Sequence, residues 1–167
     1  MRVIGIDPGI KNPAVVEIDT DSRRVRWMKL PYREDGILYT DMLNDHFDLS
    51  KADIIAHEKI SPDPKWGSKT NWRFGGAYYM SISWVAKYPY MLVSPQTWQK
   101  WAHTYIIYNA TDTSKQKAAK SFKMLHPDIK IVDRHDGMID GYLIARYAGI
   151  SNNITFPNNL SFLEIVP

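Results

Sequence analysis

Alternating apolar and polar residues mark three short strands at the beginning of the chain. The segments read RVIGID (2–7), AVVEI (14–18) and RVRWMKL (24–30), and they are rich in the β-branched residues that favour strands. A Pro-Gly turn follows the first strand, and a polar turn joins the second strand to the third. Their short spacing predicts an antiparallel meander.

Helices and strands alternate in the rest of the chain. Helical spacing of apolar residues predicts helices, and short apolar runs bounded by turn residues predict strands. We expect helices over 36–47, 75–87, 95–101, 113–125 and 133–148, strands over 53–58 and 90–94, a loop over 61–73, and a weakly structured Asn- and Pro-rich tail from residue 151. This order predicts an α/β domain over 1–150, with a mixed sheet flanked by helices and a C-terminal tail over 151–167 that packs on the domain or extends from it.

The composition is that of an ordinary globular domain. The chain has 167 residues, of which 44% are hydrophobic and 23% are charged. It contains no cysteine, which excludes disulfides, zinc sites built on cysteine and thiol nucleophiles. The longest apolar-leaning run, 74–86, is too short to cross a bilayer, and Asp7 lies too early for a signal peptide. We therefore expect a soluble intracellular protein.

Positive charge is concentrated in the middle of the chain. Residues 65–130 carry ten Lys or Arg and only Asp112 and Asp128 against them, a net charge of +8. The same stretch contains Trp66, Trp72, Phe74, Trp84, Trp98 and Trp101. Basic groups beside aromatic rings suit a phosphate backbone and unstacked bases. The alternative is that the lysines solubilise helices while the tryptophans fill the core.

Four carboxylates lie at positions that would bring acids together: two at the ends of predicted strands and two on one face of a predicted helix. Asp7 and Glu58 each end a predicted strand, and Asp136 and Asp140 lie four apart on one face of the last helix. Two like charges at that spacing repel, and a divalent cation would compensate them. Mg²⁺ prefers carboxylate oxygens and keeps waters for a substrate phosphate, so two ions sharing Asp7 would suit an in-line displacement at phosphorus.

Each acid also has a purely structural explanation. Asp133 would cap the last helix, and Asp136 would interact favourably with the helix N-terminus. Glu58 would simply end a strand at the surface.

Five segments together resemble one family, the RuvC-like Holliday junction resolvases, in its phage and poxvirus branch. These segments follow the family order over residues 1–148. They read MRVIGIDPGIKNPAVV (1–16), IIAHE (54–58), WGSKTNWRFGGAYYM (66–80), VSPQTW (93–98) and DRHDGMIDGYLIA (133–145).

The resemblance implies a ribonuclease H-like fold with a five-stranded mixed sheet, acting as a homodimer in DNA recombination and repair. It implies cleavage of four-way DNA junctions at two symmetric phosphates, with two Mg²⁺ ions, or Mn²⁺ in their place, in each active site. By position, the catalytic metal ligands would be Asp7, Glu58, Asp136 and Asp140. Bacterial members place the third acid where this chain has Gly137, so Asp133 and His135 are reserve candidates for that role.

The resemblance also indicates which residues would bind DNA. The basic helix carries lysines where the family contacts DNA, and one of them would stabilise charge on the scissile phosphate. The loop before the glycine-bearing helix would face the junction, with Trp72 stacking on an opened base unless it packs under the next helix, as we expect for Phe74. Lys11 would reach DNA or be merely solvated. The candidate DNA-binding residues are Lys11, Lys65, Lys69, Trp72, Arg73, Lys115, Lys117 and Lys120.

Three functions other than junction cleavage are compatible with parts of this sequence. A sugar-kinase or actin-like ATP enzyme shares the Asp-x-Gly turn but needs two such lobes, and this chain shows no repeat. If the protein only bound junctions, the basic block would be explained but the acids beside it would not. An assay for metal-dependent strand scission distinguishes such a protein from a nuclease. The sequence hardly distinguishes a junction-cleaving nuclease from a related nuclease that acts on RNA–DNA hybrids or other branched DNA.

Overall fold

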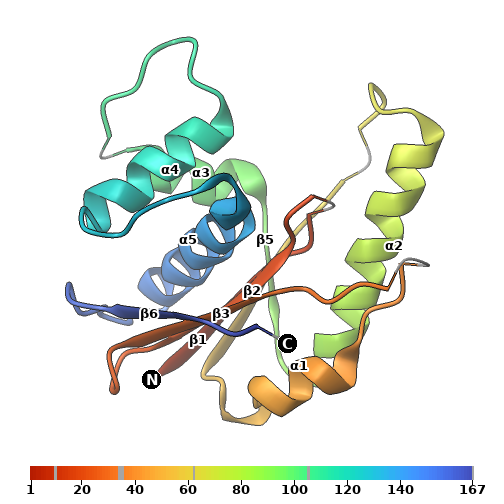
Figure 1. The fold of residues 1–167 in the computed structure, drawn as a ribbon, viewed down its shortest axis with the longest axis horizontal. Coiled ribbons are helices and arrows are strands. Elements are labelled where there is room, and N and C mark those ends of the chain that lie inside the picture. The colour runs from red at the N-terminus through yellow and green to blue at the C-terminus, as the bar shows by residue number, and fades with distance from the viewer. Residues whose placement is uncertain (10, 34–35, 62, 105, 167) are drawn as a thin grey trace.

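A six-stranded mixed sheet forms the centre of the molecule (Figure 1). This computed structural model describes residues 1–9, 11–33, 36–61, 63–104 and 106–166. The strands lie in the order β5-β4-β1-β2-β3-β6. Their bounds are β1 Arg2–Asp7, β2 Ala14–Asp19, β3 Arg24–Lys29, β4 Ile54–Glu58, β5 Met91–Val93 and β6 Ser161–Glu164. β1, β2 and β3 form the predicted antiparallel meander, whereas β4 is parallel to both β1 and β5.

The sixth strand corrects the expectation of five strands and of a weakly structured tail. β6 pairs in parallel with β3 at the edge of the sheet. Phe162 of β6 packs against the rings of Phe122, His126 and Tyr142, with centroids 4.8 to 5.6 Å apart. The other β6 side chains are half-buried or exposed, so the sequence shows no continuous apolar run there.

The described residues form five α-helices beside the sheet. They are α1 Thr40–His46, α2 Ser68–Val85, α3 Pro95–His103, α4 Ser114–Leu125 and α5 Asp136–Ser151, with 3-10 turns at Leu49–Lys51 and Asp133–His135. α1 is shorter than predicted because a bridge between Tyr32 and Leu38 holds the preceding residues extended. α2 begins at Ser68, inside the segment predicted as a loop. Most side chains of its first turns are exposed, so these turns show no apolar stripe from which a helix could be predicted. None of the helices in the described part of the chain is long and apolar enough to cross a membrane.

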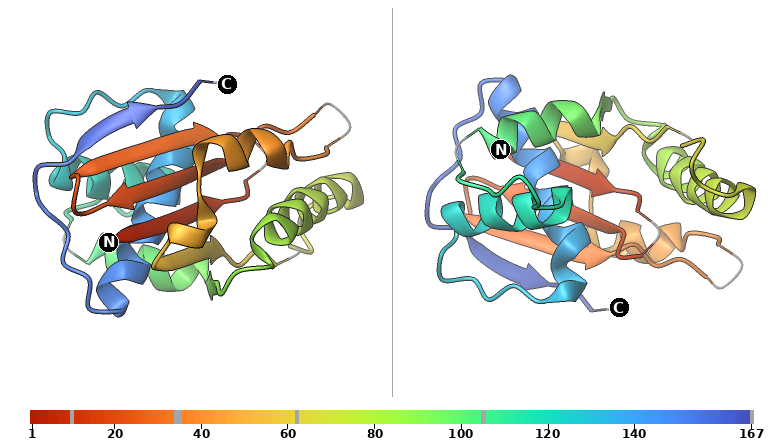
Figure 2. Two further views of the ribbon diagram at one scale, coloured as in Figure 1. Left: turned by 90° about the horizontal axis from the view of Figure 1, so that it is seen from below. Right: turned by 90° about the horizontal axis from the view of Figure 1, so that it is seen from above.

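The helices cover both faces of the sheet (Figure 2). α3, α4 and α5 lie on one face, where Tyr142 and Phe122 are fully buried in the core. α1 and the C-terminal end of α2 pack on the other face around Ile4, Leu43 and Trp84. The N-terminal part of α2 stands away from the sheet (Figure 1).

Glycines bring the backbone of α5 directly onto β1. A Cβ atom at Gly5 would overlap the carbonyl oxygen of Gly141, and one at Gly137 would overlap the carbonyl oxygen of Asn12. Neither neighbour is a flexible side chain that could move aside. The close approach therefore needs glycine at these positions, and it sets how near α5 lies to the end of β1.

Replacing Gly5 tests this contact. Gly5→Ala should lower the free energy of unfolding by about 1–3 kcal/mol, because the methyl group forces backbone apart. Gly76→Ala is the matched control, because nothing lies within 4 Å of a Cβ there. Since Gly76 lies inside a helix, its replacement should stabilise by roughly 0.5–1 kcal/mol. Urea denaturation measures both, and equal stability of Gly5→Ala and the wild type would contradict the close contact.

Candidate active site

Asp7 and Glu58 lie side by side because their strands are parallel and in register. Ile6 of β1 pairs with His57 of β4, and each acid is the next and last residue of its strand. Residues at paired positions point to the same face of a sheet. α5 crosses that face of β1, and its fifth residue is Asp140. The three carboxylates thus come from three separate parts of the chain.

A cleft of about 450 Å³ contains all three carboxylates. Lys11, Lys115, Trp66 and Phe74 also line it. Trp66 and Phe74 stack on each other, with ring centroids 4.9 Å apart. The cleft therefore combines three acids, two lysines and an aromatic wall.

Burial raises the pKa of Asp7 from 3.8 to about 6. The backbone N–H of Gly9 donates to its Oδ1 at 2.9 Å and opposes the shift, as does the charge of Lys115. The negative charge of Asp136 adds to it.

Burial likewise raises the pKa of Glu58 from 4.5 to about 8, and the charge of Asp7 contributes. One hydrogen bond opposes this shift: the indole Nε1–H of Trp98 donates to Glu58 Oε1 at 2.8 Å. The pKa of Asp140 is raised well above 3.8, first by burial and then by the charge of Asp7. Within the described residues, none of these three carboxylates forms an ion pair.

The donor chemistry of the cleft fits a hard divalent cation. One buried and two half-buried carboxylates lie in the cleft without an ion-pair partner. Their negative charges repel each other, and a cation would offset that repulsion. As the side chains stand, no group of three or more His, Cys, Asp or Glu residues among those described converges closely enough to hold an ion. Mg²⁺ binds proteins through only one or two carboxylates and keeps several waters, so it does not need three converging side chains.

The fourth predicted ligand, Asp136, lies beside the cleft lining and faces Lys115. Its Oδ2 lies 3.1 Å from Lys115 Nζ, and its side chain is 28% exposed. Partial burial lowers the pKa of Lys115, but the charges of Asp140 and Asp136 outweigh this effect and raise it overall. At the position of the bacterial third acid, Gly137 is pressed against Asn12, which leaves no space for a side chain.

The two reserve candidates do not line the described part of the cleft. Asp133 is exposed, and its carbonyl accepts a hydrogen bond from Asn12 Nδ2 at 3.3 Å. Asp133 caps no helix with its side chain, because it opens a 3-10 turn and α5 begins at Asp136. His135 packs edge-on against Trp27, with ring centroids 5.5 Å apart.

The predicted DNA-binding lysines of α4 have different surroundings. Only Lys115 lines the cleft. Lys117 Nζ lies 4.2 Å from the ring centroid of Tyr108, and Lys120 pairs with Asp112 at 2.6 Å.

The residues predicted to face a junction lie before and along the first turns of α2. Lys65, Lys69 and Arg73 are exposed, and Trp72 is 83% exposed, so the alternative of core packing for Trp72 is wrong. Phe74 is half-buried and belongs to the cleft wall. Lys11 is exposed at the rim of the cleft.

Sequence reasoning missed the partner of Glu58. The sequence shows Trp98 as one of several tryptophans in the basic block and as the last residue of the segment VSPQTW (93–98), but neither pattern connects it with Glu58. The available signal was its position one turn into a helix that follows the strand beside β4. The fully buried side chain of Trp98 reaches the end of β4 from that helix.

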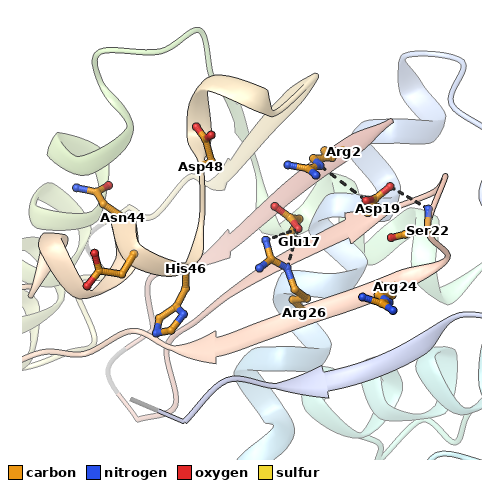
Figure 3. A pocket seen from close by; sticks show the side chains of 10 residues that line it. Arg2, Glu17, Asp19, Ser22, Arg24, Arg26, Asn44, His46 and Asp48 are labelled. Atoms are coloured by element: carbon orange, nitrogen blue, oxygen red, sulfur yellow. Dashed lines mark hydrogen bonds and ion pairs between the residues drawn. The ribbon is translucent and has the colours of Figure 1, made fainter.

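A second pocket, of about 490 Å³, lies on the opposite face of the sheet against α1 (Figure 3). It is lined by charges that largely neutralise one another. Arg26 donates from Nε and Nη2 to Glu17 Oε1 at 2.9 and 2.7 Å, and Arg2 lies 3.7 Å from Asp19. This pocket contains none of the acids that the sequence singled out.

Solved structures show which fold this is. RuvC of Thermus thermophilus in complex with a Holliday junction substrate is similar over 92% of this chain and 95% of its own, with 15% identity and a TM-score of 0.58. Another Thermus thermophilus RuvC structure is similar over 92% and 96%, with 15% identity and a TM-score of 0.53. The chain has a ribonuclease H-like fold. The likeness confirms, at the level of the fold, the resemblance to RuvC-like resolvases that the sequence carries.

A third structure, the fowlpox virus Holliday junction resolvase, is similar over 91% of this chain and 99% of its own, with 16% identity and a TM-score of 0.46. No protein-family model matches the sequence, and no curated protein matches it.

The raised pKa values predict how stability depends on pH. In chelator, the free energy of unfolding should fall as pH rises from about 6.5 to about 8, because folded Glu58 and Asp140 keep protons that the unfolded chain has already released. Below this range the buried His57 and His126, whose pKa values are lowered to about 4, oppose the effect. Mg²⁺ should restore stability at the upper end of this range. Thermal melts with EDTA and with Mg²⁺ measure both effects. Asp140→Asn should flatten the profile in EDTA, and a wild-type profile that is already flat would contradict the buried acid cluster.

Proposed function

We propose that this protein is a divalent-metal-dependent endonuclease that cuts four-way DNA junctions at paired phosphates. The observation that carries this proposal is the group of three carboxylates without ion-pair partners in one cleft, of which Asp7 is buried and Glu58 and Asp140 are half-buried, beside cationic α4. The fold shared with a junction-bound RuvC supports the substrate class.

The three cleft acids would hold the metal. Asp7, Glu58 and Asp140 supply carboxylate oxygens, the ligands that Mg²⁺ and Mn²⁺ prefer. A bound divalent ion, or a pair sharing Asp7, would supply positive charge for the phosphate and a more acidic water.

Among the α4 lysines we assign to Lys115 the contact with the scissile phosphate, because it lines the cleft. Its ammonium group lines the cleft and would donate to a non-bridging phosphate oxygen. Asp136 holds the ammonium group from outside the cleft lining. We therefore assign Asp136 to the orientation of Lys115 rather than to a place among the three cleft acids.

Basic residues on both sides of the cleft would bind the DNA backbone. Lys117 and Lys120 lie on α4, Lys11 lies at the rim, and Lys65, Lys69 and Arg73 lie before and on α2. Contacts of this kind position a duplex without reading its sequence, so branched shape would select the substrate. A symmetric homodimer would present two clefts to the two matching phosphates of a junction.

The decisive experiment compares three labelled substrates: a four-way junction, a linear duplex and an RNA–DNA hybrid, each with Mg²⁺ and with EDTA. We expect paired nicks in the junction only with Mg²⁺. Asp7→Asn should abolish cleavage yet retain or tighten junction binding in gel shifts, because it removes a metal ligand and a repulsive charge.

The outcomes separate the alternatives. Equal loss of binding and cutting in Asp7→Asn would show that Asp7 is structural. Preferential cleavage of the hybrid would favour a related nuclease. Junction binding by the folded wild type without scission in Mg²⁺ or Mn²⁺ would favour a non-catalytic junction-binding protein.

Trp72 offers a test of junction recognition. Trp72→Ala should weaken binding to a four-way junction by roughly 10-fold, as expected for loss of one stacked base, and affect a linear duplex less. The melting temperature of the Trp72→Ala variant should equal that of the wild type, because the Trp72 side chain is exposed. Tyr79→Ala, at an exposed aromatic residue two turns further along α2, is the control and should keep the wild-type preference. If Trp72→Ala weakened binding to the junction and to the linear duplex equally, Trp72 would not stack at the crossover.

A further inference from the structure

Trp98 makes a hydrogen bond that fixes one oxygen of Glu58. Its side chain is 1% exposed, and its Nε1–H donates to Glu58 Oε1 at 2.8 Å. An indole N–H can only donate, and a buried one needs an acceptor. The carboxylate of Glu58 is that acceptor, so the most deeply buried tryptophan is tied to a cleft acid.

Local structure places Trp98 there through a short chain of contacts. Glu58, the last residue of β4, pairs with Val93, the last residue of β5. Ser94 follows as the N-cap of α3, with its Oγ accepting from Thr97 N at 3.2 Å, and Pro95 opens the helix. Trp98 therefore lies one turn into a helix that starts beside Glu58.

The helix that carries Trp98 is firmly held. Trp98 and Ala102 are its buried residues, and both belong to the core formed with α4 and α5. The hydroxyl of Ser121 on α4 donates to the carbonyl oxygen of Ala102 at 2.9 Å. The indole is thus a rigid donor, and the flexible side chain of Glu58 is the member of the pair that it orients.

Glu58 has more to gain from such an anchor than the other cleft acids. A glutamate has one more rotatable bond than an aspartate, so more conformational freedom is lost when it is ordered. Asp7 is already oriented by the backbone N–H of Gly9.

We infer that Trp98 is a positioning residue for the metal centre, whose indole N–H holds Glu58 in the orientation that binds the ion. The inference rests on the proposed function, since it assigns a divalent ion to the cleft. The simpler explanation is that Trp98 only fills the core.

The chain contains a matched control for that explanation. Trp84, on the other face of the sheet, is 4% exposed, and its Nε1–H donates to Asn44 Oδ1 at 2.9 Å. Trp84→Phe and Trp98→Phe remove the same volume and the same kind of hydrogen bond from two buried sites. Only Trp98→Phe touches a cleft acid.

The experiment measures Mn²⁺ binding to the DNA-free full chain by calorimetry, together with thermal melts. Trp98→Phe should raise the Kd for Mn²⁺ by about 10-fold or more, the usual effect of losing a group that orients a metal ligand. Trp84→Phe should keep the wild-type Kd even where its melting temperature falls. An unchanged Kd in folded Trp98→Phe, or an equal rise in both variants, overturns the inference.

A second measurement covers the case in which Trp98→Phe fails to fold. In the ¹⁵N-labelled wild type, Mg²⁺ should shift the indole N–H resonance of Trp98 more than that of Trp84, with Trp98 assigned by replacing the other tryptophans. Equal shifts overturn the inference. If the wild type binds neither ion, the proposed metal centre itself fails, and the role of Trp98 falls with it.

Discussion

The direct contact between the backbones of α5 and β1 is the constraint on which the cleft depends. Gly5 and Gly141 leave no side chains between the helix and the strand, and Gly137 lets the start of α5 rest on Asn12. Asp140 consequently reaches the level of Asp7, although the two are far apart in the sequence. If methyl groups at these glycines held α5 further from β1, Asp140 would lie further from Asp7 and Glu58.

The two faces of the sheet treat buried carboxylates in opposite ways. Glu17 is 2% exposed, and Arg26 neutralises it with two hydrogen bonds. Asp7 is buried and Glu58 is half-buried, both without such a partner, and their pKa values rise. The sheet thus pairs Glu17 with an arginine but leaves the cleft acids without one. These acids remain available to a cation bound from solution.

Most of the sheet and the acids at the strand ends could be predicted from sequence, because alternation and turn residues are local signals. β6 could not, because its half-exposed residues become a strand only against β3. The first turns of α2 were also missed, since they bury almost nothing. The pairing of Asp136 with Lys115, and of Trp98 with Glu58, depends on how α4 and α3 pack, which no spacing along the chain reveals.

The edges of the sheet constrain how two copies could associate. β5 has three residues and β6 has four, so each outer strand presents few free backbone groups. Short outer strands discourage the joining of sheets between molecules. Two-fold assembly would therefore depend on helix surfaces, and the angle at which those helices cross would set the distance between the two acidic clefts.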